Sequence, residues 1–94
     1  MISAALETIL VLAHREAVHR RHGHLTLEHL LYATAHHPSG EEILRACGAD
    51  LDRLRADLGT YLESAIERVA PGADAEPLQT VAFRRVLEPT ILHL

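Results

Sequence analysis

Apolar residues recur at helical spacing along most of the chain, starting with residues 4–21. The apolar positions there are separated by three, four, seven and eleven residues, which places them on one face of a helix. They are Leu6, Ile9, Leu10, Ala13 and Ala17. Val11, Leu12 and Val18 lie off this stripe, so we expect the first helix to be covered on more than one side. Gly23 follows the basic helix end and is expected to adopt a positive φ.

A second helix is predicted from Thr26 to about Ala35, because its first residues are those of a capped N-terminus. The Thr26 hydroxyl can accept a backbone N–H of the first turn, and the charge of Glu28 complements the helix dipole. The apolar stripe of this helix follows the same spacing. It consists of Leu27, Leu30 and Leu31.

Two further helices follow a break at Pro38. Ser39 with Glu42 three residues later forms a capping box, and Gly48 ends this third helix. Its predicted inward side chains are Ile43, Leu44 and Cys47. Asp50 caps the fourth helix, whose apolar residues repeat near heptad spacing. They are Leu51, Leu54, Leu58, Tyr61, Leu62 and Ala65.

Prolines and a glycine among small residues in 69–79 indicate a flexible linker. Thr80 then caps a fifth helix, in which Pro89 is expected to produce a kink or an end. Shifting the first helix forward by 77 positions places Leu6 on Phe83, and most of its stripe again falls on apolar residues. Those residues of the fifth helix are Phe83, Val86, Leu87 and Leu94.

This internal repeat predicts the domain organisation. Residues 1–65 form one complete four-helix unit, 66–79 a linker, and 80–94 the first helix of an incomplete second unit. A helix with an apolar stripe needs a covering partner, so the fifth helix must fold back on the first unit or pair with another molecule. The predicted fold class is all-α, and the shortened repeat indicates either a truncated form or a stand-alone relative.

Composition narrows the function classes. The chain has 94 residues, 48% apolar, with net charge −4 and nine basic residues that are all arginine. Nucleic-acid binding needs clustered cations, and these are absent as a long run, so we expect no nucleic-acid partner. No apolar stretch is long enough to cross a membrane, and no secretory signal is recognisable, which predicts a cytoplasmic protein. The single cysteine, Cys47, is expected to be a buried thiol.

Candidate chemistry is sparse despite eight histidines. His14, His19 and His22 lie near one helix face but lack the further ligands of a zinc site, so we expect no metal and no cofactor. Glu28 and His29 point about 100° apart and do not form an acid/base pair; His29 is expected to be half-buried or to face solvent. No phosphate-binding loop or nucleophile motif occurs. We therefore expect no catalytic residue and no enzyme.

Arg84 and Arg85 with Thr80 form a polar cluster after the linker. Two readings stay open: a solvated charged face, or recognition of a carboxylate or a backbone carbonyl on a partner, which suits the planar arginine fork.

The sequence resembles the N-terminal domain of the Clp AAA+ ATPases, closest to the ClpA branch. The resemblance rests on five stretches over essentially the whole chain. They are Thr26–Leu31, Pro38-Ser39, Ala46-Cys47, Asp50-Leu51 and Ala82–Leu87. It implies two four-helix repeats related by a pseudo-twofold axis, of which this chain holds one and the first helix of the next.

The resemblance also implies partners. Such a domain docks the adaptor ClpS and contacts substrate proteins, as an appendage of a Clp ATPase ring that works with the ClpP peptidase. The adaptor-facing residues of the ClpA branch correspond to Thr80 and Arg85, with Arg84 beside them, and to Gly23, where relatives carry an acid. In the ClpC branch, phosphoarginine binds the glutamate that corresponds to Glu28.

Three hypotheses follow. The first is a non-enzymatic domain that binds an adaptor or substrate in a Clp-type protein-degradation system of bacteria. The second is a stand-alone relative that self-associates through the stripe of the fifth helix or regulates another Clp ATPase. The third, supported only by the histidine count, is a metal-binding or hydrolytic domain.

Overall fold

The structure, a computed structural model, describes residues 3–70 and 76–92, with side chains as far as Leu87. Its elements follow one another in a simple order, and helices dominate. They are α1 (Ala4–His19), β1 (His24–Leu25), α2 (Leu27–Ala35), α3 (Pro38–Ala46), α4 (Leu51–Ser64), β2 (Leu78–Gln79) and α5 (Val81–Leu92). The predicted all-α class is confirmed.

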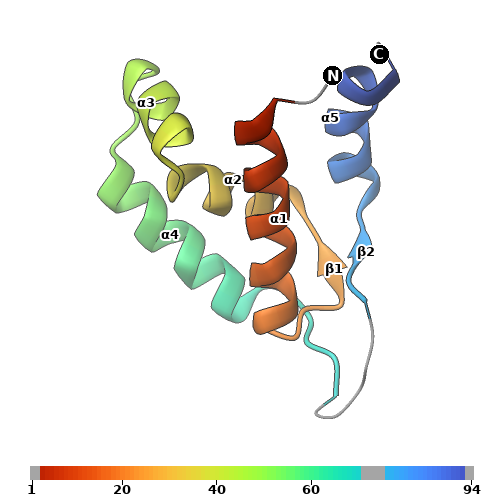
Figure 1. The fold of residues 1–94 in the computed structure, drawn as a ribbon. Coiled ribbons are helices and arrows are strands. Elements are labelled where there is room, and N and C mark those ends of the chain that lie inside the picture. The colour runs from red at the N-terminus through yellow and green to blue at the C-terminus, as the bar shows by residue number, and fades with distance from the viewer. Residues whose placement is uncertain (1–2, 71–75, 93–94) are drawn as a thin grey trace.

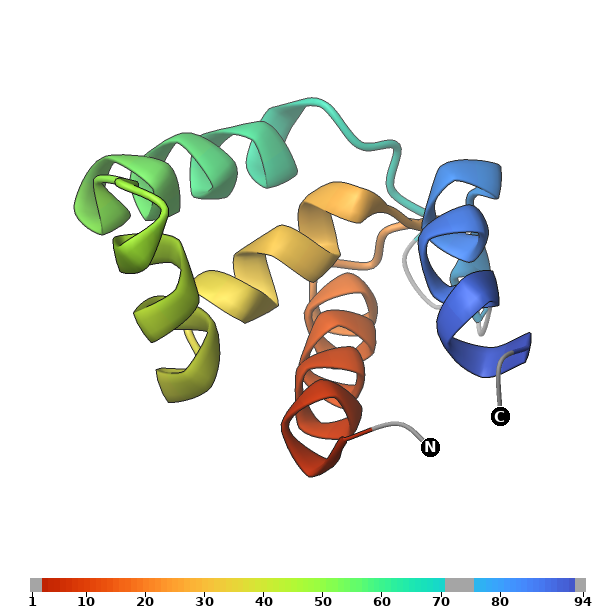
Figure 2. The ribbon, with the colours of Figure 1, turned by 90° about the horizontal axis from the view of Figure 1, so that it is seen from above.

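The helix α2 occupies the middle of the fold. It contacts α1, α3 and α4, and it also touches α5. Viewed from above, α2 runs between α1 and α4, while α5 lies beyond the opposite side of α1 from α3 (Figure 1, Figure 2). The first helix therefore has α2 on one side and α5 on the other.

The main core lies where α1, α2 and α5 meet. The predicted stripe of α1 is buried at Ile9, Ala13 and Ala17. Val11 and Val18 are exposed, so the expectation that α1 is covered on further sides is wrong at these two positions. The buried cluster draws on four elements. It consists of Ile9, Ala13, Ala17, Leu25, Ala33, Phe83 and Leu87.

The helix α5 folds back onto the first unit, which is one of the two outcomes that the repeat allowed. Phe83 is 1% exposed and Leu87 lies beside it in the main core. Val86 points outward. The stripe proposed for self-association is thus largely covered within the chain, and Leu94 lies outside the described residues. The α5 helix continues across Pro89 to Leu92, so the expectation that the helix ends at Pro89 is wrong, and the alternative of a kink stays a prediction.

Helix α2 begins as predicted but buries a different face. The Thr26 hydroxyl accepts the His29 N–H at 3.4 Å. His29 is fully buried, so its expected half-buried or solvent-facing position is wrong. Of the predicted stripe, Leu30 packs against the core as expected, but Leu31 is exposed and the small Ala33 is buried there. Close approach of α1 and α2 favours small side chains between them.

Helix α3 starts two residues earlier than predicted. His37 is its N-cap, accepting the Ser39 N–H, and proline occupies the first helical position. A proline is well placed there because its missing N–H would be unpaired in any case. The predicted Ser39 capping box is therefore wrong.

The inward face predicted for α3 is also wrong at two of its three positions. Ile43 is 62% exposed, and Cys47 is an exposed free thiol. Only Leu44 is partly buried. The end of the helix follows expectation, since Gly48 adopts a φ of 88°.

Helix α4 carries a smaller buried group against α2. Asp50 caps it as predicted, accepting the Arg53 N–H at 3.2 Å. Leu51, Leu58 and Leu62 are buried. Tyr61 is exposed, so its predicted core position is wrong.

The turn after α1 and the predicted linker are joined by backbone hydrogen bonds. The Gly23 N–H donates to the Glu67 carbonyl at 3.1 Å, and the Val69 N–H donates to the Arg21 carbonyl at 2.7 Å. Arg21, with a φ of 58°, takes the left-handed conformation that was predicted for Gly23. Residues 66–69 are therefore anchored, while 71–75 of the predicted linker lie outside the described residues.

Two glycines give a matched test of this packing. A Cβ on buried Gly40 would overlap the Thr34 carbonyl, whereas a Cβ on Gly59 meets nothing within 4 Å. We expect Gly40→Ala to lower the free energy of unfolding by about 1–3 kcal/mol and Gly59→Ala to raise it by about 0.5–1 kcal/mol. Urea unfolding midpoints measure both. A Gly40→Ala midpoint equal to or above that of the wild type would show that α3 does not pack on α2 at Gly40 and Thr34 as described.

Candidate protein-docking face

The strands β1 and β2 bring two distant segments together. They pair in parallel, with His24 opposite Leu78 and Leu25 opposite Gln79. The Gly23 carbonyl accepts the Leu78 N–H at 3.0 Å, and the Leu25 carbonyl accepts the Thr80 N–H at 3.1 Å. We call the paired segments 23–25 and 78–80 the seam. Gly23 and Thr80, both predicted to face an adaptor, lie at its two ends.

Thr80 fixes the start of α5 on this seam. Its hydroxyl accepts the Phe83 N–H at 3.2 Å, and its carbonyl accepts the Arg84 N–H at 3.0 Å. The predicted cap is therefore confirmed. Because Phe83 is anchored in the core, the neighbouring Arg84 and Arg85 are carried on a fixed first turn, and both are exposed.

Two apolar side chains close to these arginines in the sequence are also exposed. Leu78 is 66% exposed and Val81 is 64% exposed. Neither Arg84 nor Arg85 forms an ion pair with the side chains that the structure describes. We call Leu78, Gln79, Val81, Arg84 and Arg85 the β2–α5 face. This face offers apolar contact area together with two guanidinium groups that can donate hydrogen bonds to carboxylates or carbonyls.

The remaining predicted site residues differ in their relation to this face. A Cβ on Gly23 would meet the Val69 side chain at an ordinary 3.6 Å, so the position has room for a side chain. Glu28 lies half-buried in the first turn of α2. Within the described residues, no hydrogen bond connects Glu28 to the seam. Leu78 and Val81 were not predicted, because in the sequence they belong to the linker and its border.

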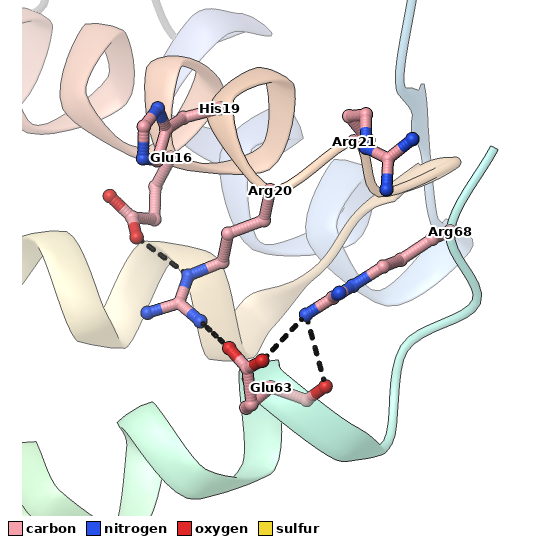
Figure 3. Close-up of a pocket in the computed structure, with 6 residues that line it drawn as sticks. All are labelled: Glu16, His19, Arg20, Arg21, Glu63 and Arg68. Atoms are coloured by element: carbon pink, nitrogen blue, oxygen red, sulfur yellow. Dashed lines mark hydrogen bonds and ion pairs between the residues drawn. The ribbon is translucent and has the colours of Figure 1, made fainter. Parts of the chain in front are cut away.

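A pocket of about 360 Å³ lies where α1 and α4 both end. Arg20 donates through Nε to Glu16 at 2.6 Å and also reaches Glu63 at 3.1 Å. Arg68 reaches the other carboxylate oxygen of Glu63 at 2.9 Å (Figure 3). Arg21 lines the same pocket.

Ion pairs among the lining residues account for the charged side chains of this pocket without a bound ligand. The hydrogen bond from Arg68, together with its charge, lowers the pKa of Glu63. Burial, the largest single effect, opposes the charge of Arg20, but its interactions with Glu16 and Tyr32 together outweigh burial and raise its pKa. Cations also suit the ends of two helices. The cluster therefore joins the end of α4 to the end of α1 and positions the chain that leads toward β2.

Metal and membrane features were searched for over the described parts of the chain. In residues 3–70 and 76–92, no group of three or more metal-ligating side chains is placed to hold an ion. No helix there has the length and apolar character needed to cross a membrane.

Comparison with known proteins gives one consistent result. Residues 1–92 match the family described as the Clp repeat N-terminal domain. The sequence is 31% identical over 93 residues to a ClpA homolog protein of Fuscovulum blasticum. That alignment covers 98% of this chain and 12% of the relative, so the chain spans only a small part of the relative's length.

Proposed function

Because this chain belongs to the Clp repeat N-terminal domain family, we propose that it docks an adaptor or substrate protein of a Clp-type unfoldase system through the β2–α5 face. Membership makes the chain an interaction domain of the Clp type. We propose a ClpS-like adaptor as the partner, and substrate delivery for ATP-dependent unfolding and degradation as the outcome.

The observation that carries this proposal is the construction of the face. The backbone hydrogen bonds to Leu78 and Thr80 hold the seam in place before any partner arrives. A preformed surface loses less conformational entropy on binding than a mobile one. The exposed apolar residues can form the dry centre of an interface, and the two arginines can engage carboxylates or carbonyls at its edge.

In this proposal the domain itself does not catalyse a reaction. ATP hydrolysis would belong to another part of a longer protein, and peptide cleavage to a ClpP peptidase. The length of the ClpA homolog, of which this chain spans 12%, leaves room for such a part. We propose a cytoplasmic location, where an exposed free thiol such as Cys47 stays reduced.

The direct test is binding of a ClpS-like adaptor by isothermal titration. We expect Arg85→Ala to weaken the affinity about tenfold or more, because an arginine at the edge of an interface loses its charge-assisted hydrogen bonds. Arg53→Ala is the matched control, since Arg53 is an exposed helical arginine on the distant α4. Equal affinities of wild type, Arg85→Ala and Arg53→Ala would refute the assigned face.

A further inference from the structure

Two histidines form a buried hydrogen-bonded pair beneath the turn after α1. His22 and His29 are 1% and 0% exposed. The Nδ1 atom of His22 lies 2.7 Å from the Nε2 atom of His29, and the rings meet edge-on with centroids 5.0 Å apart. His22 is one of the three histidines considered above for metal binding, but its ring is buried and hydrogen-bonded to His29.

Hydrogen-bond partners fix the protons of the pair. The Thr26 N–H donates to Nδ1 of His29 at 3.0 Å, so this atom carries no proton. Nε2 of His29 must then carry the proton and donate it to Nδ1 of His22. The proton of His22 is consequently on its Nε2 atom, which is buried and lacks a hydrogen-bond partner among the described residues. The Leu62 backbone near the end of α4 raises the pKa of His22 and so partly opposes the effect of burial.

An added proton disrupts this arrangement. On Nδ1 of His29 it would displace the hydrogen bond from the Thr26 N–H, with the Thr26 hydroxyl 2.9 Å away, and on Nδ1 of His22 it would face the N–H of His29. The charges of Arg20 and Arg68 also oppose a cation here. The carboxylates of Glu16 and Glu63 favour one. Burial is the largest effect: it lowers the pKa of His22, and it lowers the pKa of His29 from 6.5 to about 4.

His22 also lies at the point where residues 66–69 are held. It forms an antiparallel bridge with Arg68. The hydrogen bonds from Gly23 to Glu67 and from Val69 to Arg21 lie on its two sides. A change at His22 therefore acts directly on the contact between the turn at residues 21–23 and the chain that leaves α4.

We propose that the His22–His29 pair is an acid-sensitive latch whose protonation releases residues 66–69 from the turn at residues 21–23. The inference rests on the pair and its hydrogen bonds, and it does not depend on the proposed docking function. The direction of the pH dependence follows from the lowered pKa values of the two histidines. The closed latch holds both rings neutral, so it is fully favoured above pH 6.5 and is progressively weakened as the pH falls from 6.5 toward about 4.

Amide hydrogen exchange on the full chain, corrected for intrinsic rates, measures the latch. We expect the protection of the Gly23 and Val69 amides to fall about twentyfold between pH 7 and pH 5, if His29 titrates normally once the latch is open. The Ala13 amide in the core of α1 should lose much less protection. An equal loss at Ala13, or less than a threefold loss at Gly23 and Val69, would overturn the proposal.

Two variants distinguish the titration of the His29 ring from a general effect of substitution on the structure. His29→Gln retains an acceptor for the Thr26 N–H and a donor toward His22, as in an ordinary capping box, but it does not titrate. We expect it to lose most of the pH dependence, whereas exposed His19→Gln should keep it. Full pH dependence in His29→Gln would contradict the latch. If that variant does not fold, ring NMR on the wild type decides: a His29 midpoint at or above 6.5 would refute the proposal, and one near 4 would support it.

Discussion

Phe83→Ala is expected to lower the free energy of unfolding by about 3–5 kcal/mol. Phe83 is among the largest fully buried side chains in the described part of the chain. It joins α5 to the stripe of α1 in the main core. Its loss would leave a cavity that the small neighbours Ala13 and Ala17 cannot fill. Urea unfolding followed by circular dichroism measures the effect.

Val86→Ala is the matched control on the same helix. Val86 is half exposed, and we expect its replacement to change the free energy of unfolding by no more than about 0.5 kcal/mol. A small effect of both substitutions would mean that α5 does not belong to the cooperative unit formed by α1 and α2. It would also revive pairing of α5 with another molecule.

Leu62→Ala is expected to cost about 2–5 kcal/mol. Leu62 is fully buried near the end of α4, and its backbone faces the His22 ring. The substitution removes apolar contact between α4 and the rest of the fold. Thermal and urea unfolding measure the loss, with Arg53→Ala as the exposed control on the same helix. If Leu62→Ala unfolds at the same urea concentration as the control, the description of α4 is wrong.

Local signals in the sequence predicted the helices well. Thr26, Asp50 and Thr80 cap helices because short polar side chains accept backbone N–H groups without help from distant residues. The repeat of the α1 stripe at Phe83 and Leu87 showed that α5 needs a covering partner but left two partners open, and in the structure α5 folds back on α1. The predicted membership of the Clp N-terminal family is confirmed over residues 1–92.

Features that depend on distant contacts were missed or wrong. The pairing of β1 with β2 involves two residues in each strand, too few for a periodic pattern. The spacing of Ile43 and Cys47 suits an inward face, but α3 packs at the edge of the fold, where little covers that face. His29 is buried because His22 and Thr26 satisfy its ring nitrogens, and composition alone gives no sign of this.

The candidate site was predicted in part. Gly23 and Thr80 lie on one seam, and Arg84 and Arg85 follow it on α5. Glu28 is not joined to them by any hydrogen bond within the described residues. The apolar part of the face at Leu78 and Val81 appears only once β2 is paired, because an unpaired linker would not hold these side chains in place. The role of the four predicted residues in adaptor binding stays a prediction.

Amide chemical shifts of the labelled domain during titration with a ClpS-like adaptor test the central claim most directly. The account predicts that the largest shifts follow the seam and the start of α5. The residues concerned are Gly23, Leu78, Thr80, Arg84 and Arg85. Amides of α3 and α4 should change little. Shifts concentrated on α3 and α4, or no shifts at adaptor concentrations well above those of the domain, would contradict docking through the β2–α5 face.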